Sequence, residues 1–387
     1  MNPSLGISVI SLNCFLLVPW PIRYTSQDER SDRMGHFLSG MALDYEVAVI
    51  CLQEMDLGKG KVVHHLKRAG FCYHCTAPSP RMCKGGGLFK MLSAGLVIFS
   101  RTPILDVDFW SFSDHCVEGA ERFVSKGVLM AEVQYHHGSM RVYNTHLQAW
   151  NTKPLRARRA QQVKEISNFI EEHRVLRGEL PYIVCGDFNI DMYSNPEEIQ
   201  DIQDKLGIHT LDLSEDSLKF SSDPQTNMLV GLDDASMYST ERFPNGCLTE
   251  TLDLGTCVCC PQELLDFIGL SRGHWEEGHS ARVVPTRVNP FTGFVTHTTE
   301  RNIDVLSDHH AMVSSPLRLC MEWELRMLSP GKVVPRVPTS DALSNRYRCV
   351  VSESYIWYYV VAVVFVLLFL LLLRCIHRQL FTKSSFT

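Results

Sequence analysis

Positive charge is scarce in this sequence, and usable acceptors for N-linked glycans are missing from it. Lys and Arg together number 37 against 43 Asp and Glu, which gives a net charge of −6 over 387 residues. Proteins that bind nucleic acids usually carry a basic excess to neutralise phosphates, so the composition argues against that class. The one Asn-x-Ser sequence, at Asn2, contains the proline that blocks glycosylation, which fits a cytosol-facing domain.

The chain also lacks a recognisable secretion signal, the cysteine spacing of a zinc module and any internal repeat. The apolar run 7–20 has no basic segment before it and no small-residue cleavage site after it, so we interpret it as a core strand. Neither the Cys72-x-x-Cys75 pair nor the cysteines at 257–260 have the paired spacing of a zinc module. The cysteines inside apolar runs are interpreted as buried reduced thiols: Cys14, Cys51 and Cys185.

One long hydrophobic run is present, close to the C terminus. Residues 355–373 carry no charge, and a bilayer core needs about twenty apolar residues. Aromatic residues open this run and basic residues follow it, as at the two interfaces of a membrane. We therefore expect a transmembrane helix at 355–373, a linker at 321–353 and a short basic tail at 374–387. Basic residues on both sides do not decide the orientation, and our default is a cytosolic catalytic domain anchored in the endoplasmic reticulum or another endomembrane.

Residues 1–320 read as alternating strands and helices, which predicts an α/β domain with helices packed outside sheets. Helical periodicity predicts helices over 28–45 and 155–176. Residues 190–265 have poor periodicity and are interpreted as a long insertion, helical near 196–206. Short apolar runs rich in β-branched residues predict strands at 8–12, 47–52, 95–99, 128–133, 140–144 and 182–185.

Small polar and acidic residues follow several of these apolar runs. Glu54 ends one strand, and a carboxylate at a rigid strand end can hold a hard cation such as Mg²⁺. Asp187 follows a glycine after another strand, where it could orient or deprotonate water, while Asn189 could donate to a phosphoryl oxygen. His146 and His309 also follow strand-like runs. A histidine beside a carboxylate can exchange protons near neutral pH, so the set predicts acid–base chemistry on a phosphodiester.

The order of these motifs resembles that of the endonuclease/exonuclease/phosphatase superfamily over about residues 6–316. Within it, the chain is most similar to the neutral sphingomyelinases. The resemblance implies a DNase I-like, four-layered α/β sandwich in which two packed mixed β-sheets are flanked by helices. The motifs that carry it are Leu12-Asn13-Cys14, Leu52-Gln53-Glu54, Ser125-Lys126-Gly127, Thr145-His146-Leu147-Gln148-Ala149, Gly186-Asp187-Phe188-Asn189, Leu265-Asp266-Phe267 and Ser307-Asp308-His309.

The resemblance also implies a role for each matching residue. Asn13, Glu54 and Asp308 would gather round Mg²⁺, or Mn²⁺, that polarises the scissile phosphate. His309, oriented by Asp266 and assisted by Asp187, would be the general base. Asn189 and His146 would stabilise the phosphorane, with His146 or a metal-bound water protonating the leaving oxygen.

One pair departs from the pattern of the relatives. Many neutral sphingomyelinases have an Asp five residues before the Lys of the Lys-Gly pair, whereas this chain has Glu121 before Lys126. The extra methylene keeps the charge but moves it, which puts in doubt any tuning of the site by this pair.

The resemblance favours hydrolysis of membrane sphingomyelin to ceramide and phosphocholine, with no nucleic-acid partner. Inositol phosphosphingolipids and lysophospholipids fit the motifs equally well. A nuclease or an inositol-phosphate phosphatase on the same fold and a catalytically dead membrane scaffold are the remaining alternatives.

We hypothesise that Phe291 and Phe294, on an expected loop, dip into the bilayer. The candidates for a cation–π contact with choline are Trp20, Trp110, Trp150 and Trp275.

Overall fold

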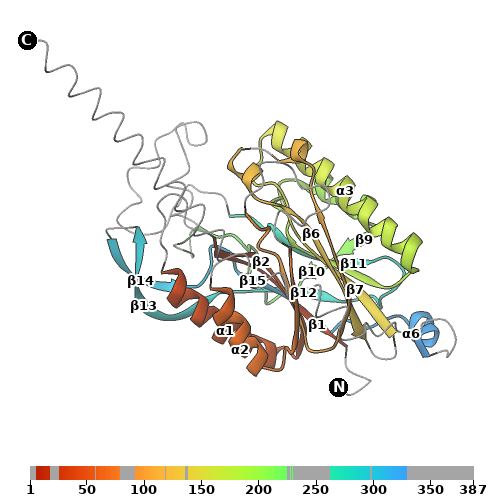
Figure 1. Ribbon diagram of the computed structural model, residues 1–387, viewed down its shortest axis with the longest axis horizontal. Helices are drawn as coiled ribbons and strands as arrows, with labels where there is room; N and C mark the ends of the chain where they lie inside the picture. The colour runs from red at the N-terminus through yellow and green to blue at the C-terminus, as the bar shows by residue number, and fades with distance from the viewer. Residues whose placement is uncertain are drawn as a thin grey trace, which may run out of the picture. The chain divides into compact units, whose positions relative to one another are not determined.

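Two mixed β-sheets form the centre of the fold in the computed structural model (Figure 1). The first has the order β10-β12-β15-β1-β2-β4-β3, from Asp212–Leu213, Ser280–Val284, Ala311–Ser314, Ser8–Leu16, Val47–Met55, Val97–Ser100 and Tyr73–Thr76. The second has the order β5-β6-β7-β8-β11-β9, from Ile104–Ser111, Gly127–Tyr135, Gly138–His146, Tyr182–Asp187, Asp266–Ser271 and Ile208–Thr210. The expected strands are all present, and the prediction of two mixed sheets with helices is confirmed.

The structure describes residues 6–17, 26–56, 58–78, 92–117, 119–135, 138–224, 227, 229, 262–296 and 299–328. Among them, no helix combines the length and apolar character needed to cross a bilayer. The expected membrane helix 355–373 and tail 374–387 lie outside the described residues, as does most of the linker 321–353. That linker begins with a described helix, α6, over Met321–Leu328.

Helices cover the outer faces of both sheets. Helices α1, Gln27–Asp44, and α2, Lys59–Arg68, pack on the first sheet, where Met34, Leu38 and Leu66 join one buried cluster with the strands. On the other side lie α3, Lys153–Arg177, and α4, Pro196–Leu206 (Figure 1). The inner faces of the sheets meet through β1 and β2 against β7 and β8. All nine residues of β1 are buried, as expected for a strand covered on both faces.

Part of the expected insertion 190–265 belongs to the sandwich itself. It contains α4, at the expected position, and the short strand β9, which pairs antiparallel with β11 at the edge of the second sheet. Residues 230–261 lie outside the described residues. A separate two-stranded sheet follows β12 and consists of β13, Arg287–Thr296, and β14, Thr299–Val305.

Candidate active site

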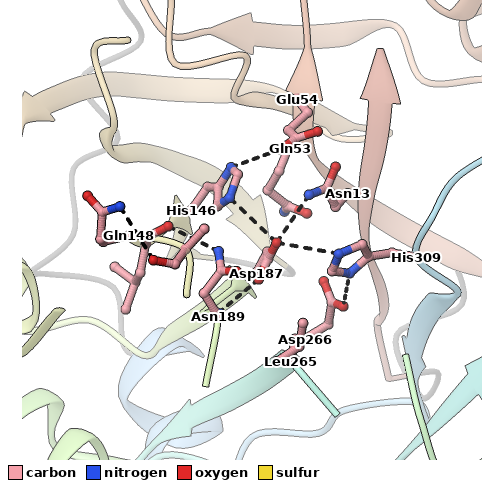
Figure 2. A network of polar contacts seen from close by, with 12 residues as sticks. Asn13, Gln53, Glu54, His146, Gln148, Asp187, Asn189, Leu265, Asp266 and His309 are labelled. Atoms are coloured by element: carbon pink, nitrogen blue, oxygen red, sulfur yellow. Dashed lines mark hydrogen bonds and ion pairs between the residues drawn. The ribbon is translucent and has the colours of Figure 1, made fainter. Parts of the chain in front are cut away.

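Strand direction brings the predicted residues to one edge of the sandwich. Strands β1 and β2 are parallel in the first sheet, and β7 and β8 are parallel in the second, so the carboxyl ends within each pair coincide. Strand β11 runs antiparallel to β8, which places its first residue, Asp266, opposite Asp187. The side chains that converge there, in Figure 2, are Asn13, Glu54, His146, Asp187, Asn189, Asp266 and His309.

Asp187 lies at the centre of this polar network and is 1% exposed. Its Oδ1 accepts the backbone N–H of Asn189 at 2.9 Å, and its Oδ2 accepts Asn13 Nδ2–H at 3.1 Å. The Nε2 atoms of His146 and His309 lie 3.5 and 3.7 Å from Oδ2 (Figure 2). Asp187 therefore links residues from both sheets.

A glycine allows this approach of β8 to β7. Gly186 has φ of 147°, and a Cβ at this position would lie 1.9 Å from the carbonyl oxygen of Thr145. Any other residue would push β8 away from β7 and move Asp187 with it. The glycine of the Gly-Asp motif thus has a steric role in the site.

His309 is paired with Asp266 in a buried dyad. The distance from His309 Nδ1 to Asp266 Oδ2 is 2.7 Å, and the two residues are 6% and 0% exposed. Burial by itself lowers the pKa of His309, but the charges of Asp266 and Asp187 and the hydrogen bond to Asp266 outweigh it and hold the pKa well above its usual range. With Nδ1 bonded to Asp266, Nε2 faces Asp187.

His146 has the opposite electrostatic environment. Burial and the nearby Lys126 ammonium lower the pKa of His146 to about 3. Lys126 Nζ lies 3.1 Å from His146 Nε2, and because an ammonium can only donate, Nε2 is the acceptor of that bond. His146 is therefore neutral near pH 7, with its N–H on Nδ1, 3.8 Å from Glu54 Oε1.

Lys126 and Glu121 form an ion pair beside His146. Lys126 is 4% exposed, its Nζ lies 2.6 Å from Glu121 Oε1, and it also donates to the carbonyl of Leu147 at 2.6 Å. Glu121 Oε2 accepts the backbone N–H of Ala149 at 3.3 Å. The longer Glu121 side chain thus contacts Lys126 and the loop after β7 together.

Glu54 and Asp308 are two partly buried carboxyl groups, and the charge of Asp308 acts on Glu54. The pKa of Glu54 lies well above its usual range, mainly because of burial and secondly because of the charge of Asp308. Burial also raises the pKa of Asp308. Two carboxylates with raised pKa values at one site are a donor set that fits a divalent cation. Asn13 Oδ1 accepts the backbone N–H of Phe15 at 3.0 Å and retains a second lone pair.

Asn189 is oriented by the backbone around it. It has φ of 54°, in the left-handed region that Asn tolerates better than most residues, and its Nδ2 donates to the carbonyl of Leu147 at 3.1 Å. This contact uses one of the two amide hydrogens, so the other can donate to a phosphate oxygen while the orientation is kept.

Two sets of hydrogen bonds that support the site were not predicted from the sequence. Gln53 Nε2 donates to Asn144 Oδ1 at 2.7 Å, and Asn144 Nδ2 donates to the carbonyls of Leu52 and Val97, which ties the two sheets together beneath the site. The guanidinium of Arg30, 0% exposed, donates to the carbonyls of Cys14, Phe15 and Leu306. Gln53 belongs to the Leu52-Gln53-Glu54 motif, which was the available signal for the first interaction.

Two of the four candidate tryptophans contact other parts of the fold. Trp110 donates to Glu165 and packs against Phe169, both on α3, and Trp275 donates to Ser271, at the end of β11 opposite to Asp266. Trp20 lies outside the described residues, and Trp150 follows β7 in the loop that begins after His146.

The expectation that Phe291 and Phe294 lie on a loop is wrong, because both belong to strand β13. Phe291 is in strand β13 and is 7% exposed, packed with Ile303 under the guanidinium of Arg33 at 4.5 Å. The side chain of Phe294 lies outside the described residues.

Comparison with known proteins identifies relatives of this fold. The model of the Endonuclease/Exonuclease/phosphatase family matches residues 12–253. A comparison with curated proteins gives no match. Among solved structures, a double mutant of beta toxin from Staphylococcus aureus with bound magnesium ions has 18% identity and a TM-score of 0.63, covering 80% of this chain and 99% of that chain.

Two further solved structures have the same architecture. Sphingomyelinase C from Streptomyces griseocarneus has 18% identity and a TM-score of 0.62, over 80% of this chain and 98% of its own. TDP2 from Caenorhabditis elegans has 15% identity and a TM-score of 0.51, over 81% of this chain and 76% of its own. At these identities the likeness shows the shared fold.

Proposed function

Because this chain belongs to the endonuclease/exonuclease/phosphatase family, we propose that it is a magnesium-dependent phosphodiesterase that hydrolyses sphingomyelin to ceramide and phosphocholine. The observation that carries the proposal is the His309–Asp266 dyad at 2.7 Å, beside Asp187 and under the electrostatic influence of the Asp308 carboxyl group. A base, a water-orienting acid and a cation-holding pair are the parts that phosphodiester hydrolysis requires.

His309 is the proposed general base. Asp266 fixes the imidazole through Nδ1, so Nε2 is the atom that takes a proton from the attacking water when His309 is in its neutral form. A cation held by the neighbouring carboxylates would offset the charges that raise the pKa of His309 and would favour that form. Asp187, 3.7 Å from Nε2, orients that water and stabilises the imidazolium once it has formed. In-line displacement depends on holding the water opposite the leaving oxygen, which this rigid dyad supports.

His146 is proposed as a neutral hydrogen-bond donor at the phosphate. A pKa of about 3 means that His146 is neutral at neutral pH and therefore a poor acid toward a leaving group, so its remaining N–H stabilises charge instead. Lys126 maintains this state from the Nε2 side and brings a positive charge to the site. Of the two proton donors considered from the sequence for the leaving oxygen, the lowered pKa disfavours His146.

Glu54, Asp308 and the remaining lone pair of Asn13 Oδ1 would hold the cation. Bound there, Mg²⁺ would polarise the phosphate and offset the charges that raise the pKa of Glu54 and Asp308. A magnesium-bound structure of beta toxin supports the choice of metal.

Sphingomyelin is the proposed substrate for two reasons. One of the structural relatives is a sphingomyelinase C, and the expected helix 355–373 would confine the catalytic domain to a membrane surface, where such a lipid resides. The domain is proposed to face the cytosol at the endoplasmic reticulum or another endomembrane. Inositol phosphosphingolipids and lysophospholipids are the neighbouring substrate classes with the same bond.

The test is phosphocholine release from sphingomyelin vesicles by the detergent-solubilised full chain, with and without Mg²⁺. Magnesium-dependent release by the wild type and its loss in His309→Gln would support both the reaction and the site. Absence of release, with hydrolysis of inositol phosphosphingolipid, lysophospholipid or DNA instead, would overturn the substrate and keep the reaction class. Inactivity of folded protein toward all four would overturn the proposal.

A further inference from the structure

A second group of metal-ligating side chains lies away from Glu54 and Asp308. Among the residues that the structure describes, His115, Cys116 and Glu165 each offer a ligand atom within 4.8 Å of the other two. His115 and Cys116 belong to the 3₁₀ turn η2, Asp114–Cys116, and Glu165 lies on α3. His115 is exposed, whereas Cys116 is 0% and Glu165 is 7% exposed.

We propose that this group is a binding site for a borderline-soft divalent ion of the Zn²⁺ class. A tetrahedral ion with sulfur and oxygen ligands at their usual bond lengths places the two ligand atoms about 3.5 Å apart. Cys116 Sγ and Glu165 Oε1 are 3.1 Å apart, so the ion fits with a small outward movement. On binding, Cys116 loses its thiol proton to solvent, and sulfur, a His115 ring nitrogen and Oε1 become the ligands.

The surroundings of Glu165 hold it in the orientation that such a site needs. Its Oε2 accepts Trp110 Nε1–H at 2.8 Å and the backbone N–H of Ser113 at 3.1 Å, which leaves Oε1 directed at Cys116. The backbone N–H of Cys116 donates to the carbonyl of Ser113 at 2.8 Å and closes the turn. Hydrogen bonds of this kind to a ligating carboxylate orient it and strengthen metal binding.

The chemistry of the donor set separates this site from the proposed magnesium site. Mg²⁺ takes oxygen ligands and loses its water reluctantly, and a thiolate is a poor partner for it. Thiolate and imidazole together favour Zn²⁺, and Co²⁺ in its place, over Mg²⁺. Three protein ligands with an exposed histidine leave a fourth position for water, so ions can enter from the surface.

One hydrogen-bonded path joins the site to the loop after β7. Gln162, one turn before Glu165 on α3, donates from Nε2 to the carbonyl of Cys116 at 3.0 Å. Its Oε1 accepts the backbone N–H of Gln148 at 2.8 Å, two residues after His146. An ion that joins η2 to α3 therefore stabilises the anchoring of this loop, and we expect it to raise the melting temperature.

A simpler account of the same geometry is a thiol that donates to a buried carboxylate. This account predicts no ion and no role for His115. It also predicts that the exposed His115 can be replaced without effect. The two accounts thus differ in measurable ways.

The experiment is a Co²⁺ titration of the chelator-treated full chain in saturating Mg²⁺, followed by the near-ultraviolet thiolate-to-Co²⁺ absorption band. We expect one Co²⁺ per chain, displacement by Zn²⁺ and loss of the band in Cys116→Ser. His115→Ala should weaken binding strongly, and Trp110→Phe, which removes one hydrogen bond to Glu165, by roughly 10–100-fold. Cys72→Ser, at an exposed thiol elsewhere, is the matched control and should bind as wild type does.

No band in the folded wild type would overturn the proposal, as would equal binding by wild type and His115→Ala. His115→Ala keeps the test valid if Cys116→Ser fails to fold, because the His115 side chain is exposed and not part of the core. The readout is independent of hydrolysis, so it stands whether or not sphingomyelin is the substrate.

Discussion

The two sheets contribute different kinds of residue to the active site. The first sheet brings Asn13 and Glu54 at the ends of β1 and β2, with Asp308 just before β15. Its two carboxyl groups repel each other, and burial raises the pKa of both. The second sheet brings His146, Asp187 and Asp266, and both of its acids have hydrogen-bond donors within the protein.

This difference suggests how the site divides its work. Buried carboxyl groups that repel one another cost stability until a cation binds, whereas carboxylates that accept hydrogen bonds stabilise the folded chain. We infer that the first sheet supplies the metal ligands and, just before β15, the base His309, whereas the second sheet supplies the acids that orient that base and the attacking water. The predictions below test that division.

The largest effect is expected for His309→Gln. An amide can keep a hydrogen bond to Asp266 but cannot take a proton from water, so we expect a fall in kcat of about 10²–10⁴ with little change in melting temperature. Phosphocholine release and thermal unfolding are the measurements. A variant that retained wild-type kcat would show that the base lies elsewhere.

The second-largest effect is expected for Glu54→Gln, in the first sheet, on Mg²⁺ binding and on stability. The substitution removes a metal ligand and also a repulsive charge, so Mg²⁺ binding should weaken while the metal-free protein becomes more stable. In the wild type, Mg²⁺ at one hundred times its Kd adds about 2.7 kcal/mol to the free energy of unfolding. Thermal unfolding with and without Mg²⁺ measures both changes.

Asp266→Asn is the control from the second sheet. The substitution removes the carboxylate that pairs with His309 and should destabilise the protein. It should not directly change the gain in the free energy of unfolding that Mg²⁺ produces. If Glu54→Gln and Asp266→Asn changed stability in the same direction, the division between the sheets would be contradicted.

A pH dependence of the metal-free protein follows from the raised pKa of Glu54. Between the unfolded value of 4.5 and the higher folded value, the folded state binds more protons, so this group makes the free energy of unfolding fall as pH rises. Relative to Glu54→Gln, the metal-free wild type should therefore gain stability as pH falls from neutral toward 4.5. Urea unfolding at several pH values measures this difference, and a wild type that lost stability relative to the variant would refute it.

The smallest effect is expected for Glu121→Asp, which restores the residue of many neutral sphingomyelinases. The shorter side chain cannot hold both the Lys126 ammonium and the backbone N–H of Ala149, so one contact is lost. The loss of one hydrogen bond costs about 0.5–1.5 kcal/mol, and we expect kcat/KM to fall by about tenfold or less. A much larger loss would mean that the pair controls the charge state of His146, which the pH profile of kcat would reveal.

Strand ends and helix faces were readable from the sequence, and they located the site. Asn13, Glu54 and His146 each close an apolar run, and parallel pairing then brings such ends together. The strand β9 was not predicted because three residues are too few to show a period. Its place at the edge of the second sheet depends on pairing with β11, which lies far along the chain.

Side-chain direction in three dimensions was the part that the sequence could not supply. Trp110 and Phe291 were candidates by residue type, yet one faces Glu165 and the other packs under Arg33. Cys116 and Glu165 lie 49 positions apart, with no motif spacing to connect them. Only the packing of α3 against η2 brings them into contact.

Arg30 has a consequence for when the protein becomes functional. Its guanidinium holds the carbonyl of Cys14, beside Asn13, and that of Leu306, just before Ser307 and Asp308. In addition, β1 lies between β2 and β15, so the first described strand has both of its neighbours only when β15, the last described strand, pairs with it. A nascent chain emerging from the ribosome therefore has no assembled active site until β15 has emerged, which delays hydrolysis until synthesis of the domain is complete.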